Sequence, residues 1–171
     1  MAVGRRHQPS SRAHPAVRAV PPGELAALFE GFVADGDEVV GIFISSEMSG
    51  TYQSAAVARE QVEMRSACAG KIHVIDSRTT TFELALLVRL AVRLRDEGKN
   101  AGEITEQISA LIKRARLIAV VDTLKYLKMS GRISTTTAFV GGLLGINPII
   151  AIIGGKVESI GKTRGLKAGL K

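Results

Sequence analysis

The sequence is poor in the residues that carry most metal and redox chemistry. Its 171 residues include one cysteine, Cys68, and three histidines, so the chain forms no internal disulfide and has no cysteine cluster for a metal ion. A lone thiol suits a reducing compartment, and we expect a cytoplasmic protein without metal or other cofactor. The last histidine, His73, precedes most of the chain, and none lies further on to activate a serine for hydrolysis.

Aromatic residues and long apolar runs are also scarce. Aromatics make up 4% of the chain and tryptophan is absent, whereas hydrophobic residues reach 46%, so the sequence predicts a core of aliphatic side chains. The longest apolar stretch, 138–153, is interrupted by glycines, an asparagine and a proline, and is too short and broken for a transmembrane helix. Residues 1–11 lack the apolar run of a signal peptide.

The net charge of +7 first suggests nucleic acid as a partner. However, residues 1–18 contain four arginines and no acidic residue, so much of the excess lies in one short segment. Basic residues do not alternate with aromatic residues of the kind that stack on bases. We therefore predict no nucleic-acid site. The net charge is the only feature that favours nucleic-acid binding.

Apolar periodicity predicts an α/β protein built on a parallel sheet. Strand-length apolar runs alternate with helical patterns of ten or more residues, which indicates crossover connections. The predicted strands are 38–45, 72–75 and 117–121, and the predicted helices are 23–34, 51–66, 82–97 and 101–114. Residues 1–22 show no apolar period and are predicted to be a disordered or aberrant tail.

The pattern changes after residue 122. A short amphipathic helix is predicted over 123–128, followed by glycine-rich apolar sequence. Residues 148–153 and 156–160, separated by Gly154 and Gly155, predict a hairpin with a two-glycine turn. We interpret 23–121 as one α/β domain and 122–171 as the start of a second, incomplete one.

The most informative segment, residues 45–55 (SSEMSGTYQSA), follows a predicted buried strand and opens a helix. Ligands of parallel α/β sheets bind at the carboxyl ends of strands, and a helix start offers free N–H groups and partial positive charge. Ser49, Gly50 and Thr51 add small hydroxyls and an uncrowded backbone. The segment therefore predicts a site for a small anion, a carboxylate or a phosphate.

Other interpretations of this segment remain open. In one alternative, Ser49 is only the helix N-cap, a role that serine often fills. The segment lacks the Gly-Lys-Ser/Thr of a P-loop and the pattern of a nucleophile elbow. An α/β enzyme or sensor that binds a small phosphorylated metabolite is the alternative function, although no pair of catalytic carboxylates or basic histidine is evident near the segment.

Four segments, in order, resemble the DegV family. The first is SSEMSGTYQSA at 45–55, and the second is VIDS at 74–77. The third combines DTLKYL at 122–127 with SGRIS at 130–134, and the fourth combines NPII at 147–150 with GGK at 154–156 and KTR at 162–164. The resemblance runs from about residue 23 to the end of the chain.

This resemblance implies a non-catalytic fatty-acid carrier. In such proteins one long-chain fatty acid lies between two α/β domains, and by resemblance Ser49 binds its carboxylate. Ser46, Gly50 and Thr51 would support the head-group loop, and Arg132 would contact the head group or the phosphate of an acyl-phosphate. Family members present the carboxylate to a fatty-acid kinase, which is the implied protein partner.

The sequence departs from the family pattern in three places. The family has a threonine-containing segment before the first helix, but Val17 stands near that position, and residues 1–20 resemble no part of the family. The family's first strand and its C-terminal part are missing, so we expect a fragment or a misread start. Residues 81–84 (TFEL) replace a glycine-rich family segment.

Overall fold

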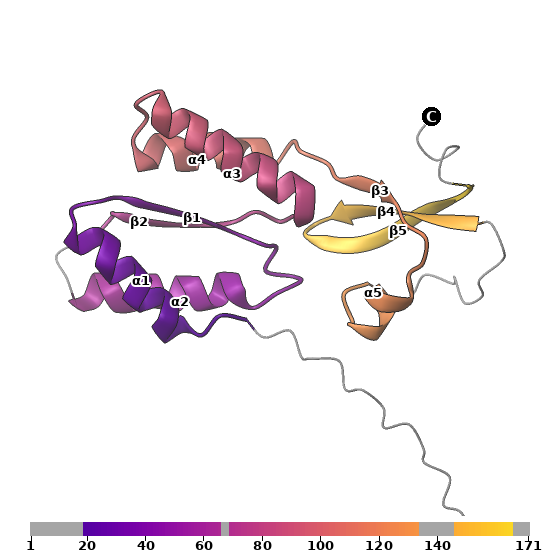
Figure 1. Cartoon of the computed structure of the whole chain (residues 1–171), viewed down its shortest axis with the longest axis horizontal. Coiled ribbons are helices and arrows are strands. Elements are labelled where there is room, and N and C mark those ends of the chain that lie inside the picture. Colours follow the sequence, from indigo (N-terminus) through magenta and orange to yellow (C-terminus); the bar gives the residue numbers. More distant parts are fainter. Residues whose placement is uncertain (1–18, 66–68, 134–145, 166–171) are drawn as a thin grey trace, which may run out of the picture.

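In the computed structural model, residues 19–65, 69–133 and 146–165 form two sheets that lie side by side (Figure 1). The first sheet consists of two parallel strands, β1 (Val39–Phe43) and β2 (Ile72–Asp76), paired in register from Val39↔Ile72 to Phe43↔Asp76. The second is antiparallel and has the order β3-β4-β5. The α/β class with parallel strands and crossover helices is therefore confirmed.

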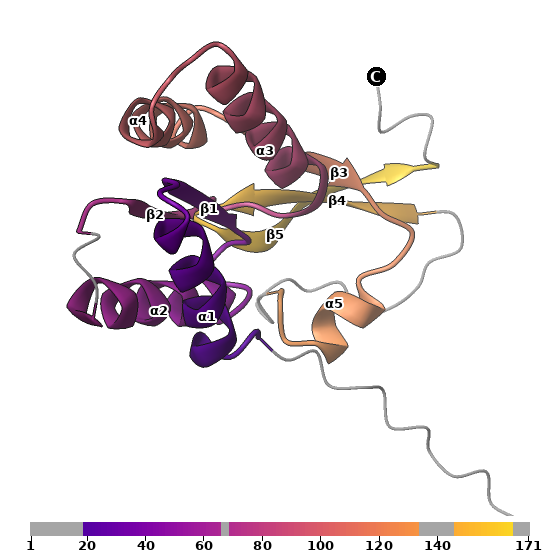
Figure 2. The same ribbon diagram turned by 60° about the vertical axis from the view of Figure 1, so that its left-hand side comes forward.

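Helices cover both faces of the parallel sheet. α1 (Pro22–Ala34) and α2 (Thr51–Arg65) lie on one face, and α3 (Thr81–Asp96) and α4 (Ala101–Ile112) lie on the other, as two views agree (Figures 1 and 2). Because successive strand residues point to opposite faces, Val39 packs with α1 and α2 whereas Val40 packs with α3 and α4. The sequence prediction of a strand covered on both faces is confirmed.

Local sequence explains where these helices begin and end. α1 starts with Pro22, whose fixed φ suits the first helical turn, and Gly36 ends it at a φ of +93°. α4 begins with a reciprocal capping box, in which the Asn100 side chain accepts from the Glu103 amide and the Glu103 side chain accepts from the Asn100 amide. The interior is mainly aliphatic, with Leu87, Ile108 and Val62 almost fully buried, although Phe29 is also buried.

The second sheet contains β3 (Ile118–Val120), β4 (Ile146–Ile153) and β5 (Lys156–Arg164), with α5 (Lys125–Met129) packed beside it. The predicted hairpin is confirmed. The prediction that residues 117–121 extend the parallel sheet is wrong, because β3 pairs antiparallel with β4. An apolar run of strand length does not specify its partner, and here that partner is a strand further along the chain.

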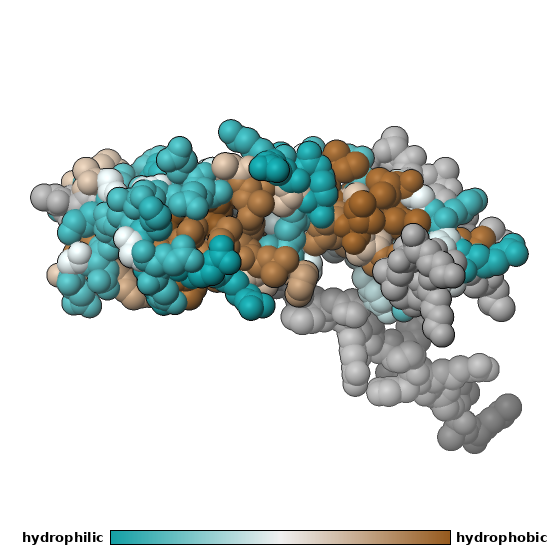
Figure 3. All heavy atoms as spheres, turned by 90° about the horizontal axis from the view of Figure 1, so that it is seen from above, coloured by the Kyte–Doolittle hydropathy of each residue, from teal (hydrophilic) through white to brown (hydrophobic). Residues whose placement is uncertain are grey.

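Both edges of the parallel sheet are unpaired in the part of the chain that the structure describes, because β1 and β2 pair only with each other. On the α3–α4 side, Leu86, Val88 and Val92 of α3 are exposed, and Ile118 is exposed on the second sheet. Figure 3 shows this side of the molecule, with apolar surface in the middle and over the second sheet.

Within 19–65, 69–133 and 146–165, no helix has both the length and the apolar character needed to cross a bilayer.

Candidate functional site

The candidate site is the β1–α2 loop, residues 45–50, at the carboxyl end of the parallel strands. Its first residue is completely buried: the Ser45 amide donates to the Thr79 carbonyl (2.9 Å), and the Ser77 amide donates to the Phe43 carbonyl (3.0 Å). These bonds fasten the loop after β1 to the loop after β2. The segment singled out from the sequence therefore lies at the sheet edge where ligands of parallel α/β proteins bind.

Asp76, the last residue of β2, fixes the next part of the loop. It accepts from the Ser46 amide (3.1 Å), from the Ser46 hydroxyl (2.5 Å) and from the Arg78 amide (2.9 Å). Since the single proton of the Ser46 hydroxyl is donated to Asp76, that hydroxyl orders the loop and cannot also donate to an anion. Asp76 belongs to the VIDS segment, but the sequence alone gives this residue no role.

Ser49 is arranged differently. Its Oγ lies 2.9 Å from Thr51 Oγ1 and accepts weakly from the Thr51 amide (3.4 Å). An N-cap side chain bonds to the second or third amide of its helix, whereas Ser49 reaches only the first residue of α2 over a long distance. When Thr51 donates to Ser49, the Ser49 proton remains free to donate outward.

The start of α2 provides further donors beside Ser49. Gly50 accepts the first helical bond, from the Ser54 amide (3.0 Å). Within the described part of the chain, the amides of Tyr52 and Gln53 have no acceptor, as is usual in a first helical turn. A Cβ at Gly50 would make only ordinary contact, with Ala19 at 3.7 Å. Ser49 and these amides together suit a small anion.

The second sheet contacts the β1–α2 loop and its neighbour Arg78 through its hairpin turn. This turn joins β4 to β5 and consists of Gly154 and Gly155. The buried Ser45 hydroxyl donates to the Gly155 carbonyl (2.6 Å), and the Arg78 guanidinium donates to the Gly154 carbonyl. Met48 packs against the core of the second sheet. The β1–α2 loop therefore lies at the junction of the two sheets.

Charged groups of both parts converge on this junction. Arg132, which the sequence nominated, donates from Nε to the Met48 carbonyl (3.4 Å) and from Nη1 to the Ser130 carbonyl (2.7 Å). Lys156 lies 3.3 Å from the Glu47 carboxylate. The structure thus brings Arg132 to the same loop as Ser49, while Arg78 and Lys156 were missed because nothing in the local sequence connects them with it.

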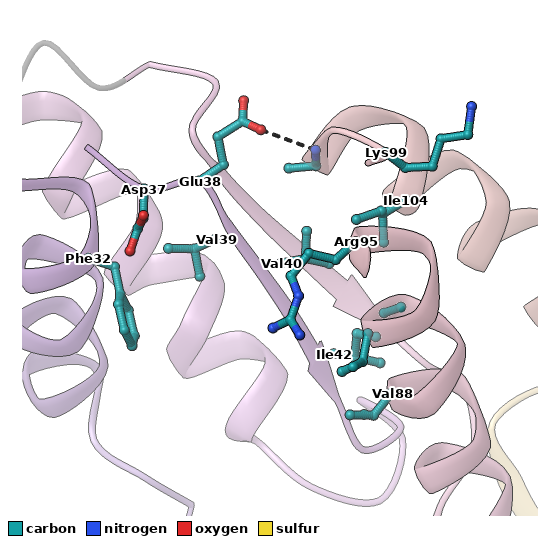
Figure 4. A pocket seen from close by; sticks show the side chains of 13 residues that line it. Phe32, Asp37, Glu38, Val39, Val40, Ile42, Val88, Arg95, Lys99 and Ile104 are labelled. Atoms are coloured by element: carbon teal, nitrogen blue, oxygen red, sulfur yellow. Dashed lines mark hydrogen bonds between the residues drawn. The ribbon is translucent and has the colours of Figure 1, made fainter. Parts of the chain in front are cut away.

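A cavity of about 730 Å³ lies elsewhere, along the open edge of β1 (Figure 4). Figure 4 shows Phe32 and Val39 on the α1 side and Val40 and Ile42 on the side of α3. Its walls also include three exposed charged residues: Glu38 just before β1, Arg95 of α3 and Lys99 between α3 and α4. Val88, Ala91 and Val92 of α3 supply apolar wall on the side of α3.

The two sheets and the loop between them define an α/β protein whose candidate site lies at a strand-to-helix junction. The family model described as "Uncharacterised protein, DegV family" matches residues 6–171. The chain belongs to the DegV family. The match begins at residue 6, so the expectation that residues 1–20 lie outside the family pattern is wrong for residues 6–20.

Relatives and solved structures agree with this assignment. A DegV domain-containing protein of Caldanaerobacter subterraneus subsp. tengcongensis is 37% identical over 157 residues, which cover 92% of this chain and 54% of the relative. A DegV family protein from Eubacterium eligens, solved loaded with heptadecanoic acid, has a TM-score of 0.77 at 32% identity, with 90% of this chain and 54% of that chain covered. A stearic acid-binding protein from Eubacterium ventriosum has a TM-score of 0.75 at 32% identity, with 87% and 50% covered. The chain thus spans about half the length of the proteins it matches.

Proposed function

We propose that this chain binds one long-chain fatty acid, with the carboxylate held at the β1–α2 loop by Ser49. The observation that carries the proposal is the position of the Ser49 hydroxyl, which lies 2.9 Å from the Thr51 hydroxyl, accepts from the Thr51 amide and stands beside the first amides of α2. Ser46, Gly50 and Thr51 support this loop, as the contacts to Asp76 and Ser54 indicate.

The electrostatics of the loop favour an anionic head group. The aligned peptide dipoles of α2 give its amino end a partial positive charge, which attracts a carboxylate. Arg132 uses two of its donors on the Met48 and Ser130 carbonyls and keeps the others for a head group or for the phosphate of an acyl-phosphate. These contacts orient the ligand at one end.

Most of the affinity comes from the tail. Burying about fifteen methylenes contributes roughly 12 kcal/mol before association and ordering costs, at about 0.8 kcal/mol for each methylene. The solved relatives described with heptadecanoic and stearic acid support a ligand of this size. We expect the apolar walls to determine affinity and the Ser49 loop to determine orientation.

The proposed role is that of a carrier without catalytic activity. Near the loop, the carboxylates of Glu47 and Asp76 are each engaged by Arg78, at 3.5 Å, so neither is poised as a free acid or base. We propose that the protein acts in the cytoplasm and presents the fatty-acid carboxylate to a fatty-acid kinase. Residues 23–121 and 122–171 remain our proposed division into domains, with β3 at the end of the first part pairing with β4 of the second.

A small phosphorylated metabolite is the second candidate, because a helix start suits phosphate as well as carboxylate. The two ligands differ in the apolar area that they bury. Native mass spectrometry of the protein purified from cells separates them: an added acyl-chain mass supports the carrier, and a bound phosphate compound or RNA contradicts it.

Replacing Ser49 tests the site directly. Loss of a hydrogen bond to a charged group costs about 1–3 kcal/mol, so Ser49→Ala should raise the Kd for stearic acid roughly 5- to 150-fold in titration calorimetry. Ser109→Ala, on the remote helix α4, is the matched control and should bind as the wild type does. An unchanged Kd for Ser49→Ala, with an intact fold by circular dichroism, would show that Ser49 does not bind the carboxylate.

A further inference from the structure

Arg78 adopts a backbone conformation that side chains rarely occupy, with φ at +53° in the turn between β2 and α3. Its side chain meets acceptors from three separate segments. Nη1 lies 3.5 Å from Asp76 Oδ2, 3.5 Å from Glu47 Oε1 and 3.5 Å from the Ser46 hydroxyl, while Nη2 donates to the Gly154 carbonyl. Such a set of contacts explains how the turn keeps an unfavourable φ.

The contact between Arg78 and Glu47 bears on anion binding, because Glu47 carries a negative charge close to Ser49. Glu47 precedes Ser49 by two residues in the same loop, and an unpaired carboxylate there would repel an anion bound by Ser49. Two cations prevent this: Arg78 lies 3.5 Å from one Glu47 oxygen and Lys156 lies 3.3 Å from the other. One cation comes from the first sheet's loops and one from the second sheet, so both parts of the fold neutralise Glu47.

We propose that Arg78 is the positioning residue of the anion site: it holds and neutralises Glu47 and fixes the hairpin turn against the β1–α2 loop, so that Ser49 faces an anion without a competing negative charge. This inference rests on the proposed function. Arg78 itself does not bind the ligand. Lys156 assists with Glu47 alone.

The chemistry of the side chain explains why arginine stands at this position. A guanidinium has five donors in a rigid planar fork and can engage a carboxylate and a carbonyl at once, whereas an ammonium group is a single point charge. Arg78 uses one nitrogen toward the carboxylates and the other toward the Gly154 carbonyl. A lysine would retain the charge but not both contacts.

The test compares two ligands of equal chain length, stearic acid and uncharged 1-octadecanol, delivered from cyclodextrin to the full chain. We expect Arg78→Ala to weaken stearic acid binding about tenfold, the scale of one charge-assisted contact, and to leave octadecanol binding within about twofold of wild type. Adding Glu47→Gln to Arg78→Ala should restore most of the loss, because the released negative charge is then absent. Arg89→Ala, which removes an exposed arginine of α3, is the charge-matched control and should change neither affinity.

Lys156→Ala provides a second variant at an exposed position if Arg78→Ala folds poorly. It should weaken stearic acid binding about threefold and spare octadecanol, since only one of two cations near Glu47 is lost. Equal losses for both ligands, or a double variant no better than Arg78→Ala, would overturn the role of Arg78 while leaving the carboxylate preference of the wild type intact. A wild type that binds acid and alcohol equally would refute the anion site itself, and the role of Arg78 with it.

Discussion

Gly155→Ala is the most direct test of how the two sheets pack, because the added methyl group would clash with residues at their junction. A Cβ at this position would lie 2.6 Å from the Ser45 hydroxyl and 3.0 Å from two atoms of the Arg78 guanidinium. The residue also has a φ of +85°, and left-handed backbone costs an L-residue about 1–2 kcal/mol. Displacing Ser45 leaves the Gly155 carbonyl without its buried donor, which costs about 1–3 kcal/mol more.

We therefore expect Gly155→Ala to lower the free energy of unfolding by about 2–5 kcal/mol. Gly154→Ala is the matched control in the same turn: its φ is +58° and nothing lies within 4 Å of the added Cβ, so only the backbone cost of about 1–2 kcal/mol applies. Urea denaturation at a constant m-value measures both. Equal destabilisation by the two substitutions would refute the close approach of the hairpin turn to Ser45 and Arg78.

Two further predictions concern α4 and its first turn. Ile108→Ala, at a side chain with 0% exposure in α4, should cost about 2–5 kcal/mol of unfolding free energy in the same assay, and a loss below about 1 kcal/mol would contradict the packing of α4 on the sheet. The pKa of the Glu103 carboxyl lies below its ordinary value of 4.5 because its side chain accepts from Lys99 and from the Asn100 amide. A lowered pKa in the folded state means that this contribution to stability is present above pH 4.5 and is lost as pH falls through the folded-state pKa. A titration of the Glu103 carboxyl by NMR should show the low pKa in the wild type and a rise toward 4.5 in Lys99→Met; identical values in both would contradict the pairing.

Several elements could be predicted from local sequence because their signals lie within a few neighbouring residues. The helical period of 51–66 and the strand-length run of 38–45 each needed only adjacent side chains, and both elements formed with ends shifted by a few residues. The loop 45–50 was recognised for the same reason, since its serines and glycine separate a strand from a helix. No comparable local signal indicated that β3 pairs with β4.

The proposed anion site shows most clearly which features local sequence indicates and which depend on the tertiary structure. Local sequence placed Ser49 at a helix start, and the resemblance to the DegV family nominated Arg132, yet neither indicated that Ser46 is bound to Asp76, 30 residues away. Nor did they indicate Arg78 and Lys156 on either side of Glu47. Charge neutralisation depends on distance in space, which a linear pattern does not record.

The sequence by itself determined the alternation of strands and helices, the aliphatic core and the small-residue loop at the end of β1, because each depends on side chains within one or two turns of chain. Only the tertiary structure decided that the hairpin turn closes onto that loop. The Ser45–Gly155 hydrogen bond joins residues 110 positions apart, and the contact forms because two sheets pack together, a property of the whole chain rather than of either segment.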